Sequence, residues 1–198
     1  MQFGLLKFQS LDRGDSGGAP WHNIVMHQLF LLRHAKAARP SAEISDHDRP
    51  LTQEGLRATA KLGQFMRKAG LAPDVVLVSS ALRTQETLEA LEAAQVWDER
   101  PNIDTIPGLY MATPMQIRDF VRELPETVRS AMVIGHNPGL HDAALGLASA
   151  AGQKPEFTQL SEGYPTASLS EFLITTQWHK VGTGTGTLQR FVRPVDLK

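Results

Sequence analysis

The chain has 198 residues, of which 41% are hydrophobic, so it can bury the core of one ordinary α/β domain. Its 20 basic and 21 acidic residues give a formal net charge of −1, which provides no general attraction to nucleic acid or to an anionic membrane. The sequence contains no cysteine, which excludes disulfides, thiolate metal ligands and enzymes that use a cysteine nucleophile.

The hydropathy of the chain indicates whether a membrane-bound, secreted or soluble protein is expected. No apolar stretch approaches the ~20 residues that a membrane-spanning helix needs, and the first residues lack the basic-then-apolar order of a secretory signal. We therefore expect a soluble, cytoplasmic protein. Residues 1–25 are rich in turn formers, as in Arg13 to Pro20, and Met26 stands just before the first strand. We predict that residues 1–25 are a disordered tail or a start-site extension, and that residues 26–198 form a single domain.

The first half of the domain alternates strand and helix. The apolar run that begins at Leu29 predicts a buried strand, which ends in the polar pair Arg33 and His34. Thr52 is a suitable N-cap for a helix that runs to about Ala69. Residues 74–78 then form a second, almost wholly apolar strand.

The alternation continues beyond that strand. Ser79 and Ser80 are expected to cap a helix that carries Arg83. A weak strand over 103–106, a helix over 114–124 and a clear strand over 131–134 follow, and Pro138 suits the first turn of another helix.

The C-terminal part departs from this alternation. Residues 167–175 and 187–192 read as two strands joined by the link 177–186, in which Trp178, His179 and Lys180 are expected to be exposed. The whole pattern predicts a three-layer α/β/α sandwich, whose mostly parallel central sheet has an antiparallel edge formed by this C-terminal hairpin.

Cationic and ionisable residues follow three of the parallel strands. Arg33 and His34 end the first, Arg83 lies one turn beyond the second, and His136 follows the fourth. The carboxyl ends of parallel strands share one edge, where α/β proteins bind ligands. Taken singly, His136 is better explained as a helix-capping or packed loop histidine, and Arg83 as a residue of a solvated helix face. Their convergence at one edge favours a site for a phosphoryl dianion, which arginine forks and helix N-termini bind well.

Histidine chemistry suits such a site. A neutral imidazole can attack phosphorus when one ring nitrogen is held by an acceptor, and flanking arginines favour the neutral form. A second histidine can stabilise the charge of the transferring group.

Four motifs, in order and spacing, resemble those of the histidine phosphatase superfamily, which includes the cofactor-dependent phosphoglycerate mutases. They are Leu32-Arg33-His34-Ala35; Arg49-Pro50-Leu51-Thr52 with Gly55; Ser79-Ser80-Ala81-Leu82-Arg83-Thr84 with Thr87; and Gly135-His136-Asn137-Pro138. The resemblance covers about residues 27–194. The short chain, without a large insertion, looks most like the phosphohistidine phosphatase branch of the SixA type.

The resemblance implies roles for individual residues. His34 would become phosphorylated, Arg33 and Arg83 would clamp the phosphate, and His136 would complete the pocket, with Asn137 beside it as a further substrate-binding residue. Water would then hydrolyse the phosphohistidine intermediate. No metal ion and no cofactor are expected: His47 lies between Asp46 and Asp48, but a metal site needs spaced ligands on rigid elements rather than a polar loop.

One position departs from the family pattern. Where the family has an acid in a stretch like Pro-Glu-Leu-Tyr, this chain reads Pro107-Gly108-Leu109-Tyr110. Asp48 and Asp104 are the candidates for the missing general acid, although each is also explained as an ordinary surface carboxylate. A phosphoramidate needs less help from an acid, because solvent can protonate its leaving imidazole, so the gap favours a substrate with a P–N bond.

We therefore predict a metal-independent phosphatase that hydrolyses phosphohistidine on a partner protein, through a covalent phosphohistidine intermediate. Two alternatives stay open: a phosphatase or mutase of a small phosphorylated metabolite, and a catalytically silent scaffold module that only binds phosphate. The sequence shows no lid insertion that would close over a small metabolite. Neither nucleic acid nor a membrane is expected as a partner.

Overall fold

The computed structural model describes residues 26–148 and 155–197 of the chain. The predicted tail, residues 1–25, lies outside the described residues. Six strands are described: β1 (His27–Arg33), β2 (Val75–Ser79), β3 (Asn102–Ile106), β4 (Ser130–Gly135), β5 (Leu169–Ile174) and β6 (Gly186–Val192). They form one sheet in the order β3-β2-β4-β1-β5-β6.

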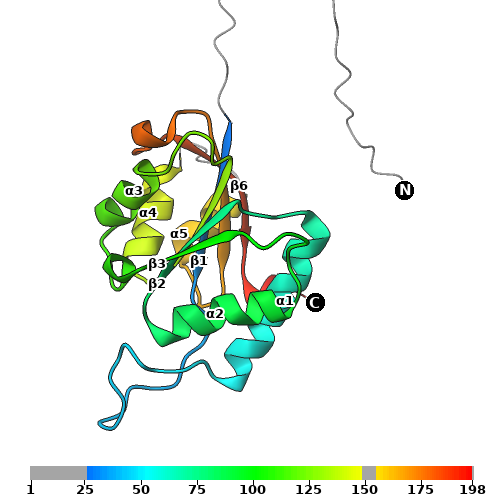
Figure 1. The fold of residues 1–198 in the computed structure, drawn as a ribbon, viewed down its shortest axis with the longest axis vertical. Helices are drawn as coiled ribbons and strands as arrows, with labels where there is room; N and C mark the ends of the chain where they lie inside the picture. Colours follow the sequence, from blue (N-terminus) through cyan, green and yellow to red (C-terminus); the bar gives the residue numbers. More distant parts are fainter. Residues whose placement is uncertain (1–25, 149–154, 198) are drawn as a thin grey trace, which may run out of the picture.

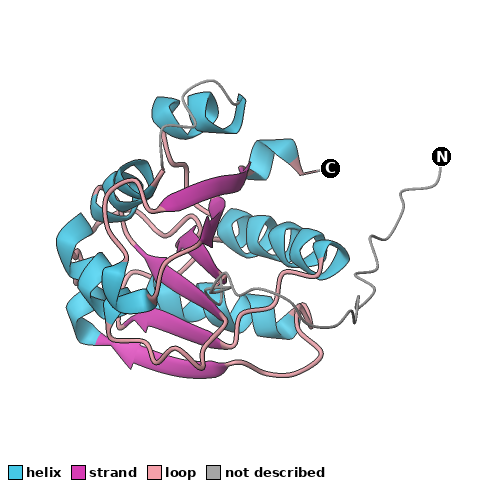
Figure 2. Cartoon of the chain, turned by 90° about the horizontal axis from the view of Figure 1, so that it is seen from above, coloured by secondary structure: helices cyan, strands magenta, loops and turns pink. Residues whose placement is uncertain are grey.

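Helices cover both faces of this sheet (Figure 2). They are α1 (Gln53–Ala69), α2 (Leu82–Ala93), α3 (Pro114–Arg122), α4 (Gly139–Leu147) and α5 (Pro155–Glu162). One hydrophobic cluster joins the sheet to α1 and α2, and another joins it to α3, α4 and α5. The predicted three-layer α/β/α sandwich is therefore confirmed.

Strand β1 lies inside the sheet, between a parallel and an antiparallel neighbour. It pairs in parallel with β4, where Leu31 lies opposite Val133, and antiparallel with β5, where Leu31 lies opposite Ser170. Strands β2 and β3 extend the parallel part, and β6 pairs antiparallel with β5. The predicted antiparallel edge is thus also confirmed, and Figure 1 shows β1 running through the middle of the molecule.

The alternation of side chains along β1 explains the two halves of the core. Leu29 and Leu31 face the cluster with α3 and α4, whereas Phe30 and Leu32 face the cluster with α1 and α2. All four are fully buried. A strand covered on both faces is apolar throughout, and this is why the apolar run of β1 predicts a buried strand from the sequence alone.

Two short-range predictions at helix starts differ in outcome. Thr52 caps α1 as predicted, since its side chain accepts a hydrogen bond from Gly55 N–H. The predicted serine cap of α2 is wrong, because Ala81 occupies the N-cap position. The Ser79 and Ser80 hydroxyls instead contact His136 and His47.

Other differences lie in the C-terminal half. Helix α5 was not predicted, because its eight residues carry only one fully buried apolar side chain, Leu160. Helix α4 begins at Gly139, one residue later than expected, with Pro138 as its N-cap. The expected exposure of Trp178 is wrong: its indole is completely buried, while His179 and Lys180 are exposed as predicted.

A glycine allows the close approach that shapes the end of β1. A Cβ on Gly55 would lie 2.3 Å from the Lys36 carbonyl oxygen, so only glycine lets the first turn of α1 pack against the chain that leaves β1. The segment from β1 to α1 then extends from that end of the sheet (Figure 1).

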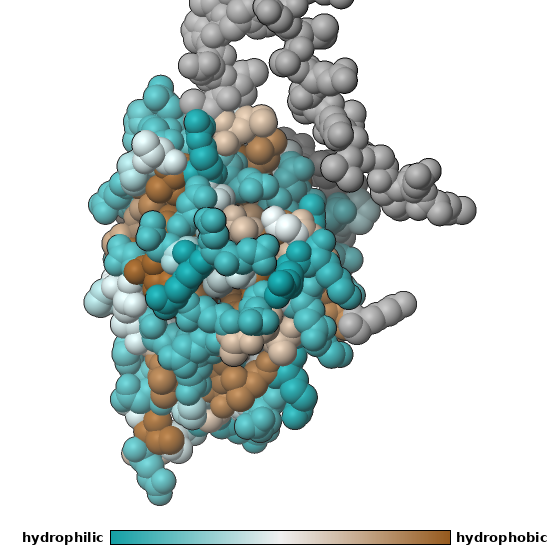
Figure 3. All heavy atoms as spheres, turned by 45° about the vertical axis from the view of Figure 1, so that its right-hand side comes forward, coloured by the Kyte–Doolittle hydropathy of each residue, from teal (hydrophilic) through white to brown (hydrophobic). Residues whose placement is uncertain are grey.

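The surface is largely hydrophilic on the face shown in Figure 3, with hydrophobic residues in small groups. In the described part of the chain, every helix is too short or too polar to cross a membrane.

Candidate active site

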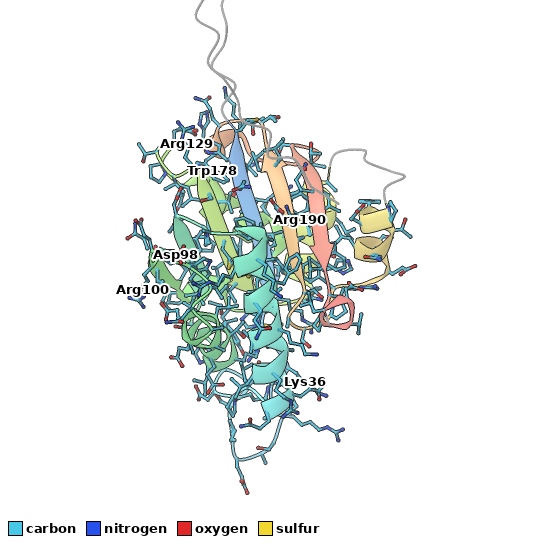
Figure 4. All side chains as sticks on the ribbon, turned by 90° about the vertical axis from the view of Figure 1, so that its right-hand side faces the viewer. Lys36, Asp98, Arg100, Arg129, Trp178 and Arg190 are labelled. Atoms are coloured by element: carbon cyan, nitrogen blue, oxygen red, sulfur yellow. The ribbon has the colours of Figure 1, made fainter. Side chains whose placement is uncertain are left out.

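A cavity of about 460 Å³ lies where β1 and β4 end. It is lined by Arg33, His34, Lys36, Ala37, Asp46, Arg49, Arg83, Tyr110, Met111, His136, Asn137 and Thr166. Figure 4 shows Lys36 at this end of the sheet and Trp178 at the opposite end. The cavity therefore opens at the edge where a parallel sheet offers its carboxyl ends.

The structure brings five of the predicted site residues to this cavity: Arg33, His34, Arg83, His136 and Asn137. The two candidate acids do not line it. Asp48 is exposed and turns toward Ser45 and His47 of its own loop. Asp104 lies exposed on β3, opposite Leu77, in the middle of an edge strand rather than at its end. Both acid assignments are therefore unsupported by position.

The two ring nitrogens of His34 have different partners. Its Nδ1 lies 2.7 Å from the Ala35 carbonyl oxygen, which can only accept a hydrogen bond, so Nδ1 carries the proton. The unprotonated Nε2 accepts a hydrogen bond from Nε of Arg83 at 3.3 Å. This is the tautomer that presents a lone pair to a ligand in the cavity.

The surroundings of His34 keep it neutral. Burial lowers the pKa of His34 to about 4, and the positive charges of Arg83, Arg33 and Arg49 act in the same direction, against the hydrogen bond to Ala35. At neutral pH the imidazole is therefore uncharged and available as a nucleophile.

His136 lies beside His34, with 5.1 Å between ring centroids. Its Nε2 is 2.8 Å from the Ser79 hydroxyl, and its Nδ1 is buried with no partner among the described residues. Burial, followed by the neighbouring His34 and Arg83, lowers the pKa of His136 to about 3. Hydrogen bonding from the Ser79 hydroxyl would leave the proton on Nδ1, where it can be donated to an oxyanion.

Arg33 and Asn137 are held by the same backbone group. Arg33 Nη1 and Asn137 Nδ2 donate to the Tyr164 carbonyl oxygen at 2.7 and 3.0 Å. Arg33 Nε and Asn137 Oδ1 remain buried without a partner in the described part of the chain. Buried polar atoms are rarely left unpaired, so these atoms, like His136 Nδ1, indicate a site built for a polar ligand.

Tyr164 itself is anchored in the core. Its side chain is buried, and its hydroxyl donates to the Leu31 carbonyl oxygen at 2.5 Å and lies 2.8 Å from the Ser170 hydroxyl. The segment after α5 is thus tied to both β1 and β5. Thr166 of this segment lines the cavity, and Ala167 N–H bonds the carbonyl oxygens of Arg33 and His34.

The cavity is strongly cationic. Arg33, Arg49, Arg83 and Lys36 line it together with a single carboxylate among the described lining residues, Asp46. A surplus of positive charge around unpartnered donors favours a dianion such as a phosphoryl group. The arrangement can bind a phosphoryl group against a neutral histidine nitrogen.

Four residues that shape this site were not predicted from the sequence: Asp46, Tyr110, Ser79 as a partner of His136, and Tyr164. Asp46 and Tyr110 lie in loops, whose conformations sequence patterns do not specify. Tyr164 acts through its backbone carbonyl, which leaves no signal in the sequence.

Within residues 26–148 and 155–197, no group of three histidine, aspartate or glutamate side chains is arranged to hold a metal ion.

Comparisons with known proteins agree with the geometry. The model of the histidine phosphatase superfamily (branch 1) matches residues 29–109. An uncharacterized protein of Mycobacterium tuberculosis is 32% identical over 166 residues, which cover 82% of this chain and 99% of the relative. The phosphohistidine phosphatase SixA of Escherichia coli is 30% identical over 113 residues, which cover 56% of this chain and 68% of that protein.

A solved structure shows the same fold. The protein histidine phosphatase SixA, in complex with tungstate, superposes with a TM-score of 0.69 at 25% identity, over 86% of this chain and 99% of that chain. The sequence and the fold thus indicate the same family, and membership of this family supports phosphatase activity. The chain belongs to the histidine phosphatase superfamily, in its SixA-type branch.

Proposed function

We propose that this protein hydrolyses phosphohistidine on a partner protein, without a metal ion or cofactor, through a phosphoryl group held transiently on His34. The observation that carries the proposal is the orientation of His34. Its Nδ1 proton is held by Ala35, and its unprotonated Nε2 accepts a hydrogen bond from Arg83, in a cavity with unpartnered donors on Arg33 and His136 among the described residues.

The first step transfers the phosphoryl group. Nε2 of His34 attacks phosphorus, a P–Nε2 bond forms, and the P–N bond to the substrate imidazole breaks with its electron pair leaving on that imidazole. The leaving imidazole takes a proton from solvent. The guanidinium groups of Arg33 and Arg83 and the Nδ1 proton of His136 stabilise the charge on the phosphoryl oxygens.

The second step returns the enzyme to its starting state. A water molecule attacks phosphorus, and the P–Nε2 bond breaks with its electron pair returning to His34. Inorganic phosphate and a proton leave the cavity. Because His34 is neutral before the first step and after the second, the cycle needs no separate reset of its protonation state.

The lining of the cavity supports a P–N substrate. Asp46, its one carboxylate among the described residues, is ionised, since the hydrogen bond from Tyr110 and the neighbouring arginines lower its pKa to about 2. Gly108 supplies no carboxylate, and a Cβ there would point to Phe120, 2.7 Å from its Cζ. An alkoxide leaving group needs a proton from an acid, whereas an imidazole accepts one from water.

The relatives support the same substrate class. The Escherichia coli relative is named a phosphohistidine phosphatase, and the SixA structure named a protein histidine phosphatase binds tungstate, an oxyanion with the shape of phosphate. The cytoplasmic location expected from the sequence stays a prediction.

The test compares two substrates in parallel. Release of inorganic phosphate is measured from a phosphohistidine-carrying protein and from an alkyl phosphomonoester, with chelator present, for wild type, His34→Ala and the control His179→Ala, an exposed histidine outside the cavity. We expect turnover of phosphohistidine, an acid-labile phosphoenzyme in wild type and control, and neither in His34→Ala.

Other outcomes separate the alternatives. A preference for the monoester would identify a metabolite phosphatase. Binding of vanadate without hydrolysis of either substrate would identify a silent module, and activity retained by His34→Ala would exclude the proposed nucleophile.

A further inference from the structure

Arg83 is a buried cation whose surroundings fix its direction. Its side chain is 2% exposed. Both terminal nitrogens bond Asp46: Nη1 donates to the backbone carbonyl oxygen at 2.6 Å, and Nη2 to Oδ2 at 3.2 Å. The remaining nitrogen, Nε, faces Nε2 of His34 at 3.3 Å. The terminal nitrogens of the guanidinium therefore bind Asp46, while its Nε–H is directed at Nε2 of His34.

Asp46 is held in turn by two other side chains. Its Oδ1 accepts a hydrogen bond from Nε of Arg49 at 2.9 Å and lies 2.8 Å from Nη2 of the same ion-paired side chain. Its Oδ2 accepts a hydrogen bond from the Tyr110 hydroxyl at 2.8 Å. The carboxylate thus sits between two guanidinium groups and a phenol. Three hydrogen bonds, from Arg49, Arg83 and Tyr110, give the carboxylate little freedom, although the side chain is 47% exposed.

Tyr110 connects this arrangement to the rest of the cavity. Its ring centre is 5.7 Å from Cζ of Arg83, and the ring meets His136 edge-on at 5.5 Å. Asp46 lies in the segment between β1 and α1, whereas Tyr110 follows β3. One hydrogen bond therefore joins two segments that both contact Arg83.

The loop that carries Asp46 is also fixed at α2. The His47 carbonyl oxygen accepts from Leu82 N–H at 3.0 Å, and His47 Nε2 lies 2.9 Å from the Ser80 hydroxyl. These contacts take the place of a side-chain cap at the start of the helix that presents Arg83. The loop and the helix are thus held as one unit.

We propose that Asp46 is a positioning residue for Arg83. It holds the two terminal nitrogens of the guanidinium so that the Nε edge is directed at the phosphoryl group on His34. This proposal rests on the proposed function, because it assigns the part that Asp46 takes in that reaction.

Two other roles make different predictions. If Asp46 donated a proton to the leaving group, its loss would slow substrates with poor leaving groups far more than those with good ones. If Asp46 competed with phosphate for Arg83, its loss would tighten the binding of oxyanions. A positioning residue, in contrast, affects all leaving groups alike and weakens oxyanion binding.

The experiment uses Asp46→Asn, which keeps the size of the side chain and removes its charge. The control is Asp48→Asn in the same loop, whose carboxylate bonds Ser45 and His47 and lies outside the cavity. We expect Asp46→Asn to lower kcat/KM by about 10- to 100-fold, by the same factor for phosphohistidine and for a series of aryl phosphates with different leaving groups. Asp48→Asn should match wild type.

A double-mutant cycle separates positioning from a purely structural role. In an Arg83→Ala background, the Asn substitution at position 46 should have little further effect, because the group that Asp46 positions is gone. If Asp46→Asn lowers kcat/KM as strongly in that background as in wild type, the proposal is overturned. It is also overturned if the loss of kcat/KM caused by Asp46→Asn grows with the pKa of the leaving group.

Vanadate affinity, measured by calorimetry, provides a test that does not depend on turnover. We expect Asp46→Asn to bind vanadate about 10-fold more weakly than wild type, whereas equal or tighter binding would overturn the proposal. If the wild type binds vanadate but hydrolyses no substrate, the proposed function fails while the vanadate comparison still decides the role of Asp46.

Discussion

Strand β1 carries a buried histidine at each end, and the two have opposite surroundings. His27, at its start, is fully buried, stacks on Trp178 with 4.3 Å between ring centroids, and has Nε2 3.1 Å from Glu126 Oε2. His34, just beyond its end, lies among arginines at a cavity. His34 has a partner for each ring nitrogen, Ala35 and Arg83, whereas Nδ1 of His27 has none among the described residues. Burial and an unpartnered nitrogen therefore do not mark a reactive histidine; convergent cations at a cavity do.

The largest expected effect tests this difference directly. His34→Gln should lower kcat/KM by about 10⁴-fold or more, because the nucleophile is lost, with little loss of stability. His27→Gln should do the reverse, with activity per folded molecule retained and stability lowered by about 1–3 kcal/mol. Steady-state kinetics and urea unfolding of both variants measure the two effects. Loss of activity in stably folded His27→Gln would contradict the prediction, because it would show that His27 also contributes to the reaction.

Substitution of Trp178 tests whether the start of β1, where His27 lies, contributes to stability by packing. Trp178→Ala removes a completely buried ring and its Nε1 hydrogen bond to the Val128 carbonyl oxygen, so we expect the free energy of unfolding to fall by about 3–5 kcal/mol. Trp97→Ala, at a half-buried indole, should cost less. Denaturant titration gives both values. An equal cost for the two variants would contradict the packing account.

The pH dependence of stability reports on the end that carries His34. Burial holds the pKa of His34 at about 4 and that of His136 at about 3, below the ordinary value near 6.5. Between pH 6.5 and about 4 the unfolded chain therefore binds more protons than the folded chain, so stability falls as the pH is lowered, on the order of a few kcal/mol.

The matched control for that measurement is His34→Gln. The difference in unfolding free energy between wild type and variant, followed from pH 7 to pH 4, isolates the contribution of His34. The wild type should lose more stability over this range, and parallel curves would show that His34 is not held neutral by the fold.

The smallest effect concerns the position where the family has an acid. A Cβ on Gly108 would lie 2.7 Å from Phe120 Cζ, so Gly108→Ala should destabilise by about 1–3 kcal/mol. Gly146→Ala, within α4, meets no atom within 4 Å and should stabilise by up to about 1 kcal/mol. Thermal unfolding compares them. A stable Gly108→Ala variant would mean that Phe120 yields, and that a carboxylate could be accommodated there.

The fold was largely predictable because strands such as β1 and β4 are apolar on both faces and helices such as α1 have a capped, amphipathic pattern. The convergence of Arg33, His34, Arg83 and His136 followed from the shared edge of parallel strands. Local capping was less predictable: Ser79 and Ser80 suit an N-cap, but tertiary partners across the sheet edge use their hydroxyls instead.

The rest of the site could not be predicted for physical reasons. Asp46 and Asp48 are two residues apart in one polar loop, and only the conformation of that loop decides that Asp46 faces the cavity. Trp178 lies in a link that looks exposed by composition, yet its ring fills the space beside His27. Contacts between residues far apart in the chain leave no periodicity in the sequence.

The position of β1 inside the sheet has a consequence for motion. Its backbone amides are hydrogen-bonded within a ladder that has a neighbour on each side, and such strands open to solvent only in rare, near-global unfolding events. Amide hydrogen exchange should therefore be slowest in the strand that leads to His34 and much faster in the exposed loop that carries Asp46. The backbone next to His34 therefore stays closed until almost the whole sheet unfolds.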